Sequence, residues 1–149
     1  GDTHVGSVDP KVERATKEMI RELSPARLVW HDLLDGKSVN PHHFGNVFQA
    51  FAKLNAGTND VRKEVEAACA FLNRMTPDGV EPIVVSSNHD DFLRRWVIAT
   101  DWRQDAKNAD FYLRTAQAML ASTKSGLGGM EMQSPFAYWL SILAPRAKV

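Results

Sequence analysis

The chain has little cysteine and no long hydrophobic run. Cys69 is the single cysteine among 149 residues, so an internal disulfide bond is excluded. This usage fits a reducing compartment, and the helical apolar pattern around Cys69 predicts a small core residue. No apolar run approaches the roughly 20 residues needed to span a bilayer, and no signal peptide is visible. These absences favour a cytoplasmic protein without a membrane partner.

The chain also lacks an excess of either charge. It has 18 basic and 18 acidic residues, so its formal net charge is zero. No global positive field would therefore draw in nucleic acid. A nucleic-acid substrate is still compatible with this balance, because bound metal ions bring their own positive charge. The length and the ordinary hydrophobic content of 44% predict a single globular domain spanning residues 1–149.

Helical and strand patterns alternate along the chain. Asp9-Pro10 is typical of a helix start. Strands are predicted at 27–31 and within 80–87, and the apolar stretch 134–145 permits a helix or a strand. Helices are predicted after Pro10, along an apolar stripe from Phe44 to Leu54, along a second stripe from Val61 to Met75, with Thr58 or Asn59 as its cap, and around 92–99 and 105–121. Strands joined by helical crossovers predict an α/β sandwich with mostly parallel strands.

Polar clusters stand at the predicted strand ends. "GDTH" opens the chain, "HDLLDG" follows the first strand and "SSNHDD" follows the second. Ligands of such sheets bind beyond the carboxyl ends of the strands. Carboxylate, imidazole and amide groups without thiolate suit Mn²⁺, Fe²⁺ or Zn²⁺, and two such ions roughly 3.5–4 Å apart can hold a phosphate and generate a hydroxide. The alternative is a set of ordinary turns, since Asn and Asp are common turn residues.

These clusters also carry a family resemblance. "DTH" at Asp2–His4, "HDLLDG" at His31–Gly36 and "SNHD" at Ser87–Asp90 resemble, in order, the first three motifs of the calcineurin-like metallophosphoesterases. Those motifs are written D-x-H, G-D-x-x-D-G and G-N-H-D/E. The match covers residues 2–90. It implies a metallophosphoesterase-like sandwich and a hydrolase in which a metal-bound hydroxide attacks phosphorus in line with the leaving alcohol, without a covalent enzyme intermediate.

The resemblance implies a metal centre with two divalent ions. Asp2 and His4 would bind the first ion, Asp32 would bridge both and Asn88 would bind the second. In an extended segment, Asp2 and His4 point to the same side. We expect Mn²⁺ first, with Fe²⁺, Zn²⁺ or Mg²⁺ as alternatives, because nitrogen and oxygen ligands alone do not separate them.

The resemblance also assigns roles on the substrate side. His89 would lie near the phosphate, as general acid or as stabiliser of the developing charge. Asp90 would orient His89 through its ring nitrogen. Asp35 is expected to fix its loop rather than to contact a metal. The implied substrate is nucleic acid, by similarity to the DNA-processing branch that includes phage-type nucleases. The same site would also suit a phosphomonoesterase, a nucleotide phosphodiesterase or a protein phosphatase.

The sequence departs from the family pattern in three places. His31 and Ser87 replace the first glycines of the second and third motifs, and His31 adds a possible ligand. No histidine follows His89, although the family has two further histidine motifs downstream. His42 and His43 could replace those ligands or contact phosphate, or they could belong to a plain polar loop. We expect a portion of a longer enzyme. The alternative is a non-catalytic module that keeps the fold and acts in assembly or binding.

Overall fold

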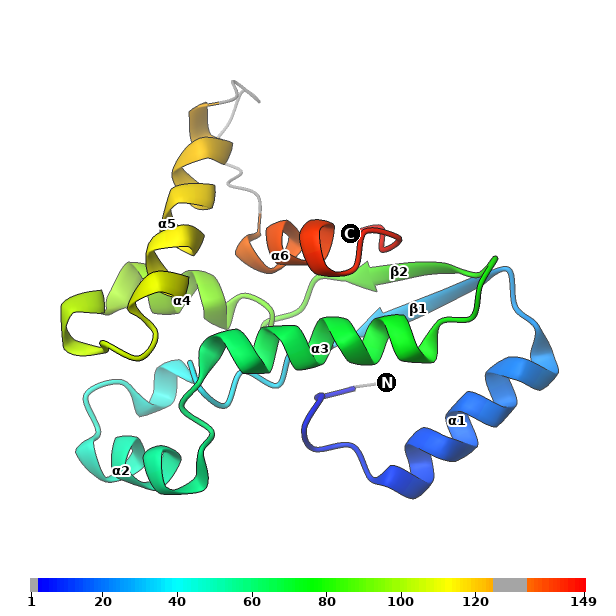
Figure 1. Ribbon diagram of the computed structural model, residues 1–149, viewed down its shortest axis with the longest axis horizontal. Helices are drawn as coiled ribbons and strands as arrows, with labels where there is room; N and C mark the ends of the chain where they lie inside the picture. Colours follow the sequence, from blue (N-terminus) through cyan, green and yellow to red (C-terminus); the bar gives the residue numbers. More distant parts are fainter. Residues whose placement is uncertain (1–2, 125–133) are drawn as a thin grey trace.

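The computed structural model describes residues 3–124 and 134–149, which form a mixed α/β structure (Figure 1). Its elements are, in chain order, α1 (Pro10–Leu23), β1 (Arg27–His31), the 3-10 helix η1 (Pro41–His43), α2 (Val47–Ala56), α3 (Val61–Met75), β2 (Glu81–Val85), α4 (Phe92–Ala99), the 3-10 helix η2 (Trp102–Gln104), α5 (Ala109–Lys124) and α6 (Pro135–Leu143). The α/β class expected from the sequence is confirmed. In this part of the chain the sheet has two strands, so the larger sandwich stays a prediction.

The two strands pair in parallel, as the helical crossover between them predicted. Val29 lies opposite Ile83, and His31 lies opposite Val85 at the carboxyl ends of β1 and β2. Parallel strands require a long crossover, which α2 and α3 supply here. Both strands therefore end at the same edge, and the loops after His31 and after Val85 begin side by side.

The amino-terminal segment reaches the same edge. The backbone N–H groups of residues 3, 4 and 5 donate to the carbonyl oxygens of residues 31, 32 and 33 over 3.1, 2.7 and 3.1 Å. A parallel bridge between Val5 and Leu34 follows directly. Residues separated by almost thirty positions are therefore held in register. The described residues of all three polar clusters therefore lie at one edge of the sheet.

Helix α3 forms the centre of the hydrophobic core. The predicted stripe Val61, Val65, Ala68, Leu72 and Met75 is buried along its whole length. Burial stabilises the fold by about 1.5–3 kcal/mol for each of the large aliphatic side chains among them. Cys69 lies on the same helix and is buried as a free thiol, as its pattern predicted.

The structure corrects several helix boundaries. Helix α2 begins at Val47 rather than at Phe44, because the Asn46 side chain accepts hydrogen bonds from two N–H groups of its first turn. Helix α3 is capped by Asp60 rather than by Thr58 or Asn59. In both cases a side-chain oxygen satisfies N–H groups that have no partner inside the helix.

The structure also corrects the start of α5 and decides between the two alternatives for the stretch 134–145. Helix α5 begins at Ala109 rather than at Asp105, because Asn108 uses its side chain to bind Asp105 and the backbone N–H of Val61. The stretch that permitted a helix or a strand is helix α6, with Pro135 in its first turn.

Among the described residues, no helix combines the length and the apolar character needed to cross a membrane.

Candidate metal site at the strand ends

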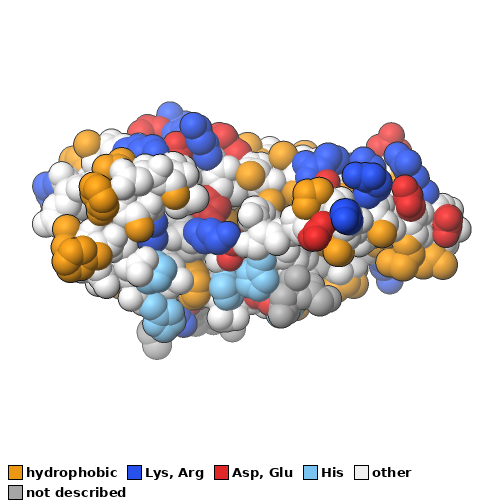
Figure 2. All heavy atoms as spheres, turned by 90° about the horizontal axis from the view of Figure 1, so that it is seen from below, with side chains coloured by type: hydrophobic (Ala, Val, Ile, Leu, Met, Phe, Trp, Pro, Cys, Tyr) orange, Lys and Arg blue, Asp and Glu red, His pale blue; other side chains and the backbone are white. Residues whose placement is uncertain are grey.

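His4, Asp35 and His89 meet at the edge where the strands end. One nitrogen or oxygen atom from each side chain lies within 4.8 Å of those from the other two, and all three residues are partly buried. Each comes from a different polar cluster of the sequence. Figure 2 shows histidine side chains in two separate groups on one face of the molecule. The predicted convergence of the three clusters is therefore present, although the residues at its centre differ from the predicted set.

The backbone of His4 is held in an uncommon conformation. Its φ is 44°, and the Asp32 residue beside it has a φ of 48°. These two left-handed residues are joined by the hydrogen bond from His4 N–H to the Asp32 carbonyl. Non-glycine residues in this region are uncommon and concentrate at functional sites. The paired kink sets the direction in which the His4 ring leaves the chain.

The His4 ring contributes a nitrogen that the surrounding protein leaves unsatisfied. Its Nδ1 is buried and makes no hydrogen bond within the part of the chain that the structure describes. It lies 3.5 Å from Oδ1 of Asp35, which is within ion-pair range but too long for a hydrogen bond. A buried nitrogen without a partner is costly, and a cation between it and the carboxylate would satisfy both.

Asp35 is fixed by groups on its other oxygen. Oδ2 accepts a hydrogen bond of 2.8 Å from the Ser7 hydroxyl and lies 3.0 Å from Nζ of Lys37. The Lys37 ammonium also donates to the Ser7 hydroxyl oxygen over 2.7 Å. Burial acts to raise the pKa of Asp35, but the Ser7 hydrogen bond and the Lys37 charge outweigh it and hold that pKa below its ordinary value. Asp35 is therefore a carboxylate at neutral pH.

His89 is oriented by the backbone of Asp35. Its Nδ1 lies 2.7 Å from the Asp35 carbonyl oxygen, which can only accept, so Nδ1 carries the proton. In neutral imidazole this leaves the lone pair on Nε2. The His89 ring also stands edge-on to the His4 ring, with 4.5 Å between the ring centroids, and lies against the Phe92 ring, with 4.7 Å between the centroids. The ring is thus fixed from three directions.

The loop that carries Asp35 is held by hydrogen bonds to Glu64 and by close packing at Gly36. Glu64 on α3 accepts hydrogen bonds from the backbone N–H groups of Lys37 and Ser38, at 2.7 and 2.9 Å. Gly36 has a φ of 73°, and a Cβ atom at this position would lie 2.7 Å from the Phe92 ring. Glycine is required here on two grounds, the left-handed backbone and the close approach of the ring.

Asp90 does not take the predicted orienting role, because it binds backbone groups instead of the His89 ring. Its carboxylate accepts from the N–H groups of Leu34 and Ser87, at 3.3 and 3.2 Å. It is 1% exposed, and burial raises its pKa despite these hydrogen bonds, with a further contribution from the charge of Asp32. Asp90 ties the loop after β1 to the loop after β2. The contact predicted for it is made by the Asp35 carbonyl.

Of the other predicted metal ligands, Asp32, Asn88 and the possible ligand His31 lie outside the three-residue group. Asp32 is 5% exposed, and its Oδ2 lies 2.7 Å from Nδ1 of His31. Asn88 is exposed, and its side chain makes no hydrogen bond to the described residues. Asp2 lies outside the described residues. The roles that the resemblance gives to Asp2, Asp32 and Asn88, and the possible role of His31 as an added ligand, therefore stay predictions.

His42 and His43 belong to η1, away from the candidate site, and His43 borders a different hollow. His42 is exposed, while His43 lies at a cavity of about 560 Å³ that it shares with Lys53. Burial lowers the pKa of His43, and the neighbouring charges of Lys53 and His42 lower it further. Neither residue is part of the group formed by His4, Asp35 and His89. The position of His42 and His43 therefore does not support the idea that they replace the downstream histidine ligands of the family.

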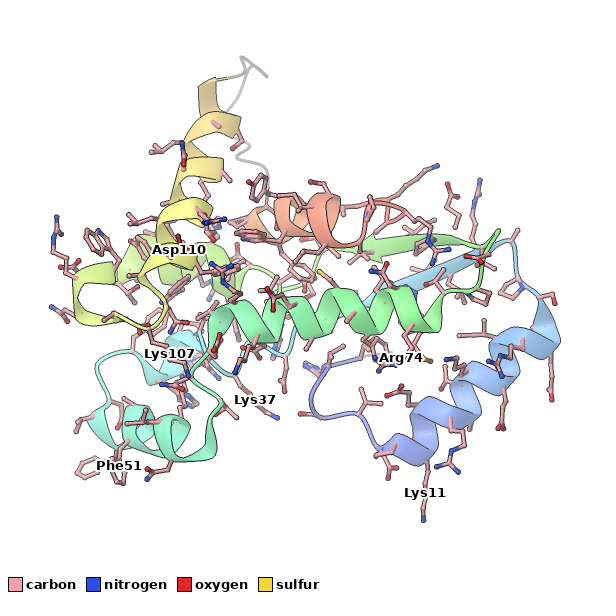
Figure 3. The ribbon with its side chains drawn as sticks, in the orientation of Figure 1. Lys11, Lys37, Phe51, Arg74, Lys107 and Asp110 are labelled. Carbon is pink, nitrogen blue, oxygen red and sulfur yellow. The ribbon has the colours of Figure 1, made fainter. Side chains whose placement is uncertain are left out.

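A second hollow opens beside the candidate site. It has a volume of about 480 Å³, and Ser7 lies on its wall together with His4 and Asp35. Sequence reasoning missed Ser7, Lys37 and Glu64 altogether. Lys37 directly follows the second motif, which is the one signal that could have found it (Figure 3 labels it). Ser7 and Glu64 carry no such signal, since their contacts exist only in the folded chain.

The donor set fits a divalent metal ion. Two imidazoles and one carboxylate suit Mn²⁺, Fe²⁺ or Zn²⁺. Ligands about 2.0–2.2 Å from a shared ion lie within about 4.4 Å of one another, so small side-chain rotations would close the present spacing. The carbonyl contact on His89 is the kind of outer hydrogen bond that orients metal-binding histidines. Compared with known protein families, curated proteins and solved structures, the chain matches none of them.

Proposed function

We propose that this chain is a metal-dependent phosphoesterase of the metallophosphoesterase type, with a divalent ion held by His4, Asp35 and His89. The observation that carries the proposal is the meeting of these three side chains at the carboxyl edge of a parallel sheet. Three motifs in family order supply one ligand each. When bound, the ion would polarise a phosphate and supply an acidified water, which is the chemistry of metal-assisted hydrolysis.

The protein's own residues would hold the ion, bind the phosphate and position the two loops. Asp35 and His4 would fix the ion, and the Asp35 carbonyl would keep the Nε2 lone pair of His89 directed toward it. Lys37 stands with its ammonium 3.0 Å from the Asp35 carboxylate and half-exposed to solvent. A phosphate beside the ion would therefore lie within reach of Lys37, which would bind it as a cation. Asp90 would hold the two loops in register from within the protein.

The preferred substrate class is a phosphodiester, with nucleic acid as the finer proposal. Support for nucleic acid comes from the motifs alone, namely the histidine in the second motif and the His42-His43 pair after it. The second ion that the resemblance implies would depend on Asp32 and Asn88. Mn²⁺ is the first ion to test.

Hydrolysis of bis-p-nitrophenyl phosphate with Mn²⁺ tests the proposal. We expect activity in the wild-type chain, and in any longer protein that contains it, and at least about a hundredfold loss in Asp35→Asn. Asp110→Asn is the matched control, because that carboxylate lies on the exposed surface of α5 and should leave activity unchanged. Single- and double-stranded DNA in the same assay then test the substrate class.

His89 needs a separate readout, because the resemblance and the geometry give it different roles. If His89 is a ligand, His89→Ala weakens Mn²⁺ binding and activity together. If it is a general acid, the substitution lowers kcat and leaves Mn²⁺ binding intact. Mn²⁺ binding without hydrolysis in either the chain or a longer protein would favour the alternative function, a binding module that keeps the fold.

A further inference from the structure

Helix α2 presents an apolar face to solvent. Val47, Phe48, Phe51 and Leu54 are 69%, 82%, 63% and 59% exposed, and none of the ten residues of α2 is buried. In Figure 3, Phe51 points away from the rest of the molecule. Figure 2 shows hydrophobic side chains gathered at the end of the molecule where α2 lies. A single exposed apolar residue is ordinary, but four on three turns of one helix form a continuous patch.

The spacing of these residues is that of a helix-packing stripe. Val47, Phe51 and Leu54 stand at positions i, i+4 and i+7, and Phe48 lies beside them. Both ends of the helix are fixed. The Asn46 side chain caps the start, and Gly57, in the left-handed conformation, ends it. The patch is thus preorganised, and a partner would not have to order it.

The charge around the patch decides between classes of partner. Lys53 is the one charged residue of α2, and its ammonium donates to the Ser38 carbonyl, away from the apolar stripe. Nucleic acid and anionic lipid surfaces both require exposed cations, which the stripe does not offer. Two copies of the stripe, however, come together without repulsion between like charges. A second copy of the chain is therefore the partner that the chemistry favours.

The area is sufficient for such a pair. At about 100–200 Å² for each exposed side chain, the four residues offer roughly 500 Å² on one copy, and thus about 1,000 Å² in a symmetric pair. That value reaches the lower bound for a specific interface. We propose that α2 forms the two-fold interface of a homodimer, in which its apolar stripe packs against the α2 helix of a second copy. This proposal does not depend on the metal site.

Sedimentation velocity on the full chain, over about a hundredfold range of concentration, tests the dimer. We expect the wild type to sediment as a dimer, and Phe51→Glu to weaken association by at least about tenfold. Leu23→Glu is the matched control, since Leu23 is 70% exposed but lies on α1. It should leave association unchanged. A monomeric wild type, or equal weakening by both variants, would overturn the proposal.

A covalent test guards against a variant that fails to fold. Phe51→Cys introduces one exposed thiol, while the native Cys69 is buried and its pKa is raised to about 12 by burial and by the Glu66 charge. A short bismaleimide should therefore link two Phe51→Cys chains and leave the wild type unlinked. Linking of Leu23→Cys with equal yield, or no linking of Phe51→Cys, would also contradict the assigned interface.

Discussion

The His89 ring is bound to the backbone of Asp35, with Nδ1 2.7 Å from the carbonyl oxygen. One residue thus acts on two members of the candidate site. The Asp35 carboxylate faces His4, and its carbonyl fixes the tautomer of His89. Any change that moves the Asp35 loop must therefore disturb both imidazoles together.

Gly36→Ala should disturb the site through Phe92. The added Cβ would lie 2.7 Å from a ring carbon of Phe92, which packs against His89. We expect a loss of about 1–3 kcal/mol in the free energy of unfolding beyond the cost of the left-handed backbone alone, measured by urea denaturation. Gly45→Ala is the matched control, because Gly45 has a φ of 74° and no atom within 4 Å of the added Cβ. Equal losses in the two variants would contradict the close-approach argument.

Asp90→Ala should destabilise the fold strongly. The substitution leaves the buried N–H group of Leu34 and the partly buried N–H group of Ser87 without their acceptor, at a cost of about 2–4 kcal/mol in the free energy of unfolding. His89→Ala removes one hydrogen bond, to the Asp35 carbonyl, and the ring contacts with His4 and Phe92, but it leaves a single acceptor rather than two donors unpaired and should cost less. Denaturation of both variants in the absence of metal makes the comparison. A larger loss for His89→Ala would mean that Asp90 is not the main link between the loop after β1 and the loop after β2.

Asp90 should also give a distinctive pH dependence. Its pKa is raised in the folded protein by burial, so its favourable contribution is fully present below the unfolded value of 3.8 and is lost as pH rises through the folded pKa. The wild type should therefore gain stability relative to Asp90→Asn as pH falls from 7 toward 4. Parallel stability curves for the two proteins over this range would refute the assignment.

Lys37→Gln should affect substrate binding more than the fold. The substitution removes the ammonium and with it a charge-assisted hydrogen bond to phosphate, worth about 1.5–3 kcal/mol. The KM for a phosphodiester should therefore rise at least about tenfold. Lys63→Gln serves as control, because that side chain is 80% exposed and pairs with Asp60 at the start of α3. An unchanged KM for Lys37→Gln, with hydrolysis present in the wild type, would remove Lys37 from the substrate site and leave the metal proposal standing.

The strands and their convergence could be read from the sequence because they depend on local patterns. Two apolar runs joined by helical stripes predict parallel neighbours, and parallel neighbours bring their polar ends to one edge. The inclusion of Asp35 could not be read in this way. It depends on the left-handed backbone at His4 and Asp32 and on the packing of the Phe92 ring against Gly36.

The exposure of α2 could not be predicted from the sequence either. The apolar stripe from Phe44 to Leu54 predicted this helix, which begins at Val47, and such a stripe normally faces the core. The periodicity of a helix identifies its apolar face but not the surface that covers it. Here α3 fills the centre, and the α2 stripe is left outside it.

The most direct test of the metal proposal is to locate Mn²⁺ by its anomalous scattering in crystals of the chain grown with the ion. We expect a peak between His4, Asp35 and His89, and its loss in Asp35→Asn crystals grown under the same conditions. A peak that contacts Asp32 and Asn88 but not Asp35, or no peak at this edge of the sheet, would contradict it.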